Sequence, residues 1–191
     1  MEKKYRVGIV GGTGMVGQRF ATLLEHHPWF TVTAIAASGR SAGKTYGQAV
    51  EGRWMMERPV PQNMKDLVVK DAQDVEAMKR EVDFVFCAVD MKKEKIRQLE
   101  EAYAKAEVPV VSNNSAHRGT PDVPMVIPEI NPEHTGVIPA QRRRLGTERG
   151  FIAVKSNCSI QSYVPAIHPL LQYGVTDVLA CTYQAISGAG K

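Results

Sequence analysis

The sequence predicts an α/β protein with a Rossmann-type, mostly parallel sheet, followed by the start of an α+β domain. Short apolar runs alternate with helix-like segments along the chain, which is typical of parallel sheets. A glycine-rich turn joins the first strand to the first helix. The 191 residues suffice for one ordinary domain and part of a second.

The first part of the chain reads as strand, turn, helix and strand. Residues 6–10 form an apolar run that ends in glycines and predicts a buried strand. Residues 14–26 predict a helix and residues 31–37 a second strand. The expected apolar face of that helix comprises Val16, Phe20, Leu23 and Leu24. Residues 38–64 are rich in Gly, Ser and Pro, which predicts a loop with at most one short helix.

The middle of the chain predicts two strands on either side of a helix. Residues 82–89 and 108–112 are apolar and strand-like. Residues 93–105 form a charged amphipathic helix. Its apolar positions are Ile96, Leu99 and Tyr103. Residues 113–131 predict mostly loop.

The last part predicts a strand, a helix and a further strand. Residues 151–154 form the first strand, and a helix begins near Cys158. One side of this helix carries Ile160, Val164, Ile167 and Leu171. Pro165 and Pro169 predict a kink, because proline lacks the backbone N–H that a helix interior needs. Residues 175–186 predict the final strand.

Composition and charge exclude several classes of protein. Hydrophobic residues make up 43% and charged residues 23% of the chain, as in globular proteins. The formal net charge of +4 is mild, and there is no basic arm or basic–aromatic stripe. We therefore expect no nucleic-acid binding. The charge run at residues 142–144 predicts a solvated surface.

The cysteines and the apolar runs bear on location. Cys87, Cys158 and Cys181 are odd in number and widely spaced, so they predict neither a disulfide framework nor a metal site. The amino terminus lacks the apolar core of a signal peptide. No apolar run approaches the roughly 20 residues that span a bilayer. We therefore expect a cytoplasmic protein with no membrane contact.

The glycine-rich turn predicts a dinucleotide site. It follows the first strand, opens the first helix and fits the pattern G-x-G-x-x-G. Glycines let the backbone approach a pyrophosphate, and the helix start offers unpaired N–H groups. The candidate cofactor residues of the turn are Gly11, Gly12, Thr13, Gly14, Met15, Val16 and Gly17. The alternative is a tight turn without a ligand.

The end of the second strand favours NADP over NAD. An NAD site usually places an Asp or Glu about 20 residues beyond the turn, on the ribose hydroxyls. Residues 36–44 contain no carboxylate. They carry two hydroxyls and two cations, which can bind and neutralise a 2′-phosphate. These are Ser38, Arg40, Ser41 and Lys44. An ordinary basic surface loop is the alternative.

Cys158 is the candidate nucleophile. It lies within Ser-Asn-Cys-Ser, after a strand and at an expected helix start, where the helix dipole favours a thiolate. Asn157 can cap the helix or donate to a developing oxyanion. Cys87 and Cys181 lie in apolar stretches and predict core residues. The residues alone leave open whether Cys158 is a nucleophile or a buried structural thiol.

These motifs together resemble the aspartate-semialdehyde dehydrogenases. The glycine turn, Ser-Asn-Cys-Ser at residues 156–159 and Tyr-Gln-Ala-Ile-Ser-Gly-Ala-Gly at residues 183–190 occur in that family's order. Residues 113–118 and 128–131 also look like motifs of the family. The cysteine motif is similar to the branch shared by archaeal and fungal enzymes. The resemblance covers essentially the whole chain.

The resemblance implies an NADP-dependent oxidoreductase. The family converts L-aspartyl 4-phosphate to L-aspartate 4-semialdehyde and phosphate, in lysine, methionine and threonine biosynthesis. Small-molecule acyl phosphate and phosphate are the implied partners, and the full-length protein is expected to be a homodimer or homotetramer.

The resemblance also implies roles for individual residues. Cys158 would form a thioester with the acyl group, Asn157 would lie beside the reacting carbonyl, and Gln184 would orient the acyl group. Arg118 would hold the phosphate. Ser187 and Gly188 would lie near the nicotinamide.

The resemblance further implies an NADP-binding Rossmann domain at residues 1–155 and the beginning of an incomplete catalytic domain at residues 156–191. The family continues well beyond position 191 with a catalytic and dimerisation domain that carries the acid–base histidine, and none of the five histidines here matches that motif. We therefore expect the 191-residue chain alone to be inactive. N-acetyl-glutamyl-phosphate reductase and a non-catalytic NADP-binding module are the alternative readings.

Overall fold

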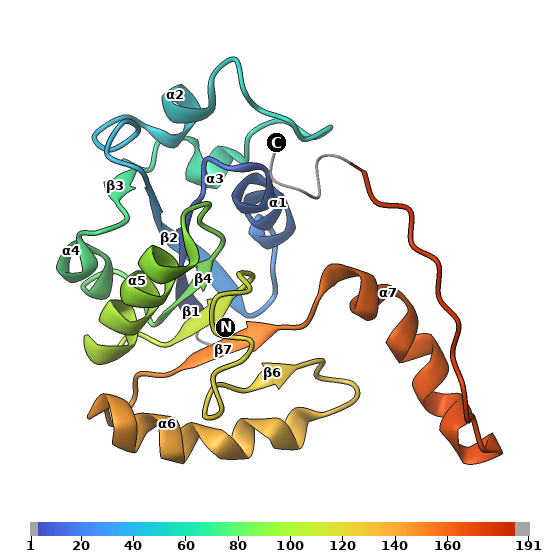
Figure 1. Ribbon diagram of the computed structural model, residues 1–191. Helices are drawn as coiled ribbons and strands as arrows, with labels where there is room; N and C mark the ends of the chain where they lie inside the picture. The colour runs from blue at the N-terminus through green and yellow to red at the C-terminus, as the bar shows by residue number, and fades with distance from the viewer. Residues whose placement is uncertain (1–3, 186–191) are drawn as a thin grey trace.

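A parallel sheet with helices on both faces forms the body of the molecule (Figure 1). The computed structural model describes residues 4–185. Seven strands lie in the order β3-β2-β1-β4-β5-β7-β6, and every neighbouring pair is parallel. The predicted Rossmann-type fold is confirmed.

The strands and helices alternate along most of the chain. The strands are β1 (Tyr5–Val10), β2 (Phe30–Ala37), β3 (Lys70–Asp71), β4 (Phe84–Cys87), β5 (Val110–Ser112), β6 (Met125–Val126) and β7 (Ile152–Lys155). The helices are α1 (Met15–Leu24), α2 (Tyr46–Val50), α3 (Gln62–Lys65), α4 (Val75–Lys79), α5 (Lys93–Lys105), η1 (Pro132–Val137), α6 (Ile138–Leu145), α7 (Cys158–Ile167) and η2 (His168–Tyr173). None of those within residues 4–185 is long and apolar enough to cross a membrane.

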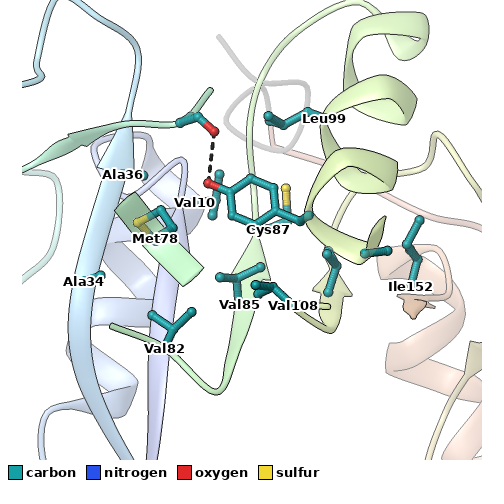
Figure 2. Packing of buried hydrophobic residues seen from close by; sticks show 14 of the residues in the cluster. Val10, Ala34, Ala36, Met78, Val82, Val85, Cys87, Leu99, Val108 and Ile152 are labelled. Carbon is teal, nitrogen blue, oxygen red and sulfur yellow. Dashed lines mark hydrogen bonds between the residues drawn. The ribbon is translucent and has the colours of Figure 1, made fainter. Parts of the chain in front are cut away.

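One face of the sheet packs against α4, α5 and α6. Met78 of α4, Leu99 of α5 and Leu145 of α6 join the buried residues of the strands in a single apolar cluster. Figure 2 shows part of this cluster, including Cys87 of β4 among valines and alanines. The hydrogen bond drawn there joins a buried tyrosine hydroxyl, that of Tyr103, to the carbonyl oxygen of Ala72 at 2.9 Å. Cys87 is therefore a core residue, as predicted.

The opposite face packs against α1, α2 and α3. Strand residues alternate between the faces, so Ile9 joins this second cluster whereas Val10 joins the first. Ala21 of α1, Tyr46 of α2 and Met64 of α3 cover the strands here. The helices on both faces explain why the central strands are apolar throughout.

The buried face of α1 differs from the predicted one. Leu24 is buried as expected, but Val16 is 42% exposed and Leu23 60% exposed. Ala21 and the polar Gln18 occupy the buried positions instead. A long polar side chain can be buried when its amide finds hydrogen-bond partners, and periodicity of apolar residues does not reveal that.

Several short elements were not predicted. The stretch 38–64 contains two short helices, α2 and α3, where at most one was expected, and β3 and α4 follow. β6 lies inside the predicted loop 113–131. The charge run at residues 142–144 belongs to the last turn of α6, which ends at Gly146 in the left-handed conformation. Proline in its first turn and glycine just after its end were signals for this helix.

The segment after β7 leaves the body of the protein (Figure 1). Within the described part of the chain, neither α7 nor η2 buries a side chain. The predicted strand at 175–186 is wrong, because residues 175–185 have no regular secondary structure. Cys181 is exposed rather than in a core. A strand requires a neighbour for its hydrogen bonds, and local sequence does not show whether one is present.

Candidate functional site

The candidate site residues lie at one edge of the sheet. In a parallel sheet the carboxyl ends of all strands meet at the same edge, where ligands of such folds bind. The glycine turn follows β1, the basic loop follows β2, and Ser156 follows β7. The strand order reverses between β1 and β4, so the glycine turn is next to the switch point.

Close packing explains the glycines of the turn. Gly11 has a φ of +91°, and a side chain there would lie 2.5 Å from the carbonyl oxygen of Ala88, just beyond β4. A side chain at Gly17 would lie 2.6 Å from the Cα atom of Gly12. Gly14 differs, because it is exposed and a side chain there would meet only the carbonyl oxygen of Gly11, at an ordinary contact distance of 3.5 Å. The turn is thus fixed on its inner side and accessible at Gly14.

The start of α1 is suited to an anion. Gly14 is the N-cap residue, and no side chain caps the helix. The first N–H groups of a helix lack intrahelical partners and carry the positive end of its dipole. Together with the open backbone at Gly14, this fits the pyrophosphate of a dinucleotide.

Two buried polar residues that the sequence did not single out hold the turn in place. The Tyr46 hydroxyl donates to the carbonyl oxygen of Gly12 at 2.9 Å. The Gln18 amide donates to the carbonyl oxygens of Thr13, at 3.1 Å, and Arg53, at 3.0 Å. Its own oxygen accepts a further backbone N–H at 2.8 Å. The glycine turn is therefore joined to the segment after α2.

The loop after β2 presents part of the predicted cationic set. Ser38, Arg40 and Lys44 are exposed. Ser41 is buried, and its hydroxyl accepts a hydrogen bond of 2.9 Å from the Arg53 guanidinium. Arg53 is thus a third cation beside this loop, from a part of the chain that the sequence interpretation passed over.

A carboxylate also lies beside this loop. Asp71 of β3 pairs with Ala37 at the end of β2, and a side chain added at Gly39 would lie 3.3 Å from its Oδ2 atom. The loop itself contains no carboxylate, as the sequence shows, but its surroundings do. The strand pairing brings Asp71 there, and a local reading of residues 36–44 does not include it.

Cys158 is exposed at the start of α7. Asn157 is the N-cap residue, and its side-chain oxygen accepts the Ser159 N–H at 2.8 Å. The predicted capping role of Asn157 is confirmed, and its amide nitrogen is left to donate to another group. Within the residues that the structure describes, Cys158 is not buried.

Gln184 lies against the cysteine. Its Nε2 atom is 3.8 Å from the Cys158 Sγ atom and donates to it, although the two residues are 26 positions apart. Both line a groove of about 600 Å³ between α7 and the segment that follows η2. Ser187 and Gly188 lie outside the described residues.

Arg118 and Lys155 are two cations that meet at the end of β7, three residues before Cys158. The Arg118 Nε donates to the Lys155 carbonyl oxygen at 3.1 Å. Burial lowers the pKa of Lys155, the Arg118 charge lowers it further, and the thiolate of Cys158 acts in the opposite direction. Lys155, at the end of β7, was not among the predicted site residues.

A buried polar cluster lies beneath the loop that carries Arg118. Glu100 of α5 is fully buried and accepts hydrogen bonds from Ser112, at 2.5 Å, and Asn114, at 3.0 Å. Its second oxygen is 3.9 Å from the Nε2 atom of His117, which is also buried. His117 is therefore a structural residue of this cluster. Burial raises the pKa of the Cys87 thiol, and Glu100 adds to that effect.

The greater part of the chain matches a known protein family. Residues 6–138 match the family described as "Semialdehyde dehydrogenase, NAD binding domain". The match covers β1 to β6 and ends before β7 and Cys158.

Curated relatives carry the more specific name aspartate-semialdehyde dehydrogenase. An aspartate-semialdehyde dehydrogenase of Archaeoglobus fulgidus is 43% identical over 189 residues, covering 98% of this chain and 52% of the relative. One of Cryptococcus neoformans is 38% identical over 187 residues, covering 97% of this chain and 50% of the relative. The chain spans about half the length of the curated relatives it matches.

A solved structure has the same fold. The aspartate-semialdehyde dehydrogenase of Candida albicans, determined with NADP, superposes with a TM-score of 0.77 at 36% identity. The superposition covers 90% of this chain and 48% of that one.

Proposed function

This chain belongs to the semialdehyde dehydrogenase family of NAD-binding domains, and from that premise we propose that it is part of an NADP-dependent aspartate-semialdehyde dehydrogenase. The reaction would be the reductive dephosphorylation of L-aspartyl 4-phosphate to L-aspartate 4-semialdehyde, in lysine, methionine and threonine biosynthesis. The cytoplasm is the proposed location. The observation that carries the proposal is the exposed Cys158 at a helix start, with the Gln184 amide donating to its sulfur.

The sheet edge supports NADP as the cofactor. The open backbone at Gly14 and the uncapped start of α1 suit the pyrophosphate. Ser38, Arg40 and Lys44 are exposed beside it and suit the 2′-phosphate. Ser41 would act through its contact with Arg53. The relative from Candida albicans was determined with NADP.

Cys158 would carry the covalent step. Its thiolate attacks the acyl carbon, a C–S bond forms, and the C–O bond to phosphate breaks as phosphate leaves with the electron pair. Arg118 would bind that phosphate, which its planar guanidinium suits. When bound, NADPH supplies the hydride that reduces the thioester carbon. Cleavage of the C–S bond then releases the aldehyde and regenerates the thiolate.

Asn157 and Gln184 would orient the acyl group. The Asn157 side-chain oxygen caps α7, so its amide nitrogen can donate to the oxyanion that develops on the acyl carbon. Gln184 is within hydrogen-bond reach of the sulfur to which the acyl group would be attached. Ser187 and Gly188 would complete the nicotinamide site.

We assign residues 1–155 to the cofactor domain and residues 156–191 to the opening of a catalytic domain. Both apolar clusters draw on the elements up to β7, whereas α7 and η2 bury no side chain in the described chain. The acid–base histidine would come from outside these 191 residues, so this chain alone would show little or no turnover. The complete enzyme would be a homodimer or homotetramer.

The test uses the complete enzyme and its Cys158→Ala and Gln184→Ala variants. Incubation with L-aspartate 4-semialdehyde and NADP, without phosphate, should leave an aspartyl group on the Cys158 peptide, detected by mass spectrometry. Cys158→Ala should lose that adduct and at least about 10³-fold in kcat. Gln184→Ala should lose roughly 10–100-fold in kcat with a smaller change in KM.

Three outcomes would overturn the proposal. Undiminished turnover by Cys158→Ala would show that the reaction needs no thioester at Cys158. Preference for N-acetyl-glutamyl phosphate over aspartyl phosphate would assign the other reductase. Alkylation of Cys158 near neutral pH no faster than that of Cys181, together with tight NADPH binding, would indicate a non-catalytic cofactor module.

A further inference from the structure

Lys155 is a cation placed between the sheet and the nucleophile. It is the last residue of β7 and lies three positions before Cys158. Val154 packs into the core on the α5 side, so the alternation along the strand directs Lys155 to the opposite face. The residue is only half-buried there, as is Ala153 beside it.

The lysine amine bends back over that turn. Its Nζ atom donates to the carbonyl oxygen of Ser156 at 3.4 Å. Arg118 donates to the carbonyl oxygen of Lys155 itself. The two cations are thus held against the same two residues of backbone, directly before the cysteine.

Neither cation has a carboxylate partner. Within residues 4–185, all ion pairs shorter than 4 Å involve other residues than Arg118 and Lys155. The titratable side chains that line the groove beside Cys158 are Tyr163, Cys181 and Tyr183, and none is a cation. Lys155 lies three positions before Cys158 and is close enough for the Cys158 thiolate to affect its pKa, and Arg118 is hydrogen-bonded to its backbone.

Such an arrangement is unfavourable until an anion is present. Two like charges held together repel each other, and partial burial weakens the screening by water. Burial is the largest cause of the lowered pKa of Lys155, and the charge of Arg118 is the second. The Cys158 thiolate acts in the opposite direction and raises this pKa. An anion bound between the two cations would offset both their mutual repulsion and the cost of burying the Lys155 charge.

We propose that Lys155 is an anion-binding residue of this site, which with Arg118 holds the phosphate of the acyl phosphate substrate and stabilises the Cys158 thiolate. The inference rests on the proposed function, which supplies the two anions: the thiolate that attacks and the phosphate that leaves. Arg118 alone would give one planar donor set, and Lys155 adds a point charge whose Nζ atom is held over the Ser156 carbonyl, two residues before Cys158.

The charge is measured most directly with a pair of alkylating reagents. Iodoacetate is an anion and iodoacetamide is neutral, so the ratio of their rates at Cys158 reports the local positive charge. The 191-residue chain is treated at pH 7.5, and alkylation is followed at each cysteine by peptide mass spectrometry. The variants are Lys155→Met and Lys155→Arg, with Lys79→Met, which removes an exposed lysine from α4, as the matched control.

Lys155→Met should lower the iodoacetate-to-iodoacetamide ratio at Cys158 roughly threefold, as expected for one unit charge several ångströms away in a largely aqueous setting. Lys155→Arg and Lys79→Met should leave the ratio close to that of the wild type. An unchanged ratio in Lys155→Met overturns the proposal.

A second measurement requires no variant. Replacing chloride by inorganic phosphate at constant ionic strength should slow alkylation of wild-type Cys158 by iodoacetate at least about twofold by 50 mM. Lack of protection at that concentration overturns the proposal too. Neither readout depends on turnover. A complete enzyme that shows the charge effect but no acyl transfer would refute the proposed function and leave the anion site standing.

Discussion

At the scale of single residues, the two cysteines Cys87 and Cys158 lie in opposite surroundings. Cys87 is 2% exposed within an apolar cluster, and burial raises the pKa of its thiol well above the ordinary value. Cys158 is exposed at a strand–helix junction with a cation before it. Reactivity of a cysteine follows from such surroundings. The flanking residues Asn157 and Ser159 indicated this contrast before the fold was known.

Gly17→Ala should damage the cofactor turn. The added methyl group would lie 2.6 Å from the Cα atom of Gly12, which is backbone and cannot rotate away. We expect a loss of about 1–3 kcal/mol in the free energy of unfolding and at least roughly tenfold weaker NADPH binding. Urea unfolding and fluorescence titration measure these. Gly119→Ala, where no atom lies within 4 Å, is the control and should change neither.

His117 should make the protein less stable in mild acid. Burial lowers the pKa of His117 below its ordinary value of 6.5, although Glu100 and Glu101 of α5 act against this and Arg97 of the same helix reinforces it by charge. The folded state then binds fewer protons than the unfolded state. The contribution of neutral His117 to the free energy of unfolding is therefore complete above pH 6.5. It is lost as the pH falls from there towards the folded-state pKa of His117.

Replacement of His117 tests that linkage. The free energy of unfolding of the wild type, measured in urea at pH 7.5, 6.5 and 5.5, should fall more steeply than that of His117→Asn. His26→Asn changes an exposed histidine and should keep the wild-type slope. Equal slopes in wild type and His117→Asn would contradict the assignment.

At the scale of elements, packing partners decide what each segment becomes. Helix α5 was predicted with its observed bounds because its charged and apolar positions follow the helical period and it lies on a sheet. Helix α6 has few apolar residues, and it is held by Leu145 and by the bond from the Gln141 amide to the Ile152 carbonyl oxygen, at 2.9 Å. The segment 175–185 has the composition of a strand but no strand beside it.

Gly146→Ala should shorten or loosen α6. Gly146 ends the helix with a φ of +71°, a conformation that costs an alanine about 1 kcal/mol. We expect a loss of that order in the free energy of unfolding, measured by thermal or urea unfolding. Gly136→Ala, also in open surroundings but without a positive φ, should be neutral or slightly stabilising.

At the scale of the whole molecule, stability is concentrated in the sheet and its two apolar clusters. β1, β4 and β5 are interior strands, and their buried valines and isoleucine are almost fully shielded from water. In contrast, Leu179 is 97% exposed and Tyr183 fully exposed in the segment that lines the Cys158 groove. Local opening is cheapest where few apolar contacts must be broken.

Hydrogen exchange should reveal this division in the 191-residue chain. Amides of β1, β4 and β5 should exchange only through global unfolding, and those of residues 158–185 should exchange with little protection. Limited proteolysis should accordingly cleave after position 155 and leave a resistant amino-terminal core. Strong protection of residues 175–185 in a monomer would show that the groove is closed by contacts other than those described.

The sequence alone determined the fold class, most of the strands, the glycine turn and the position of Cys158 at a helix start. Each of these depends on short-range information: periodicity of apolar residues, residues that permit a tight turn, and polar neighbours at a helix start. The family could likewise be identified from motifs spread along the chain.

Only the tertiary structure decided which distant residues meet. It placed Tyr46 and Gln18 beneath the glycine turn, joined Arg118 to the backbone of Lys155, and brought Gln184 against the Cys158 sulfur. It also decided that 175–185 is not a strand. Side-chain contacts between separate elements, and the presence of a partner for a strand, depend on how the chain packs in three dimensions, which the local pattern of residues does not contain.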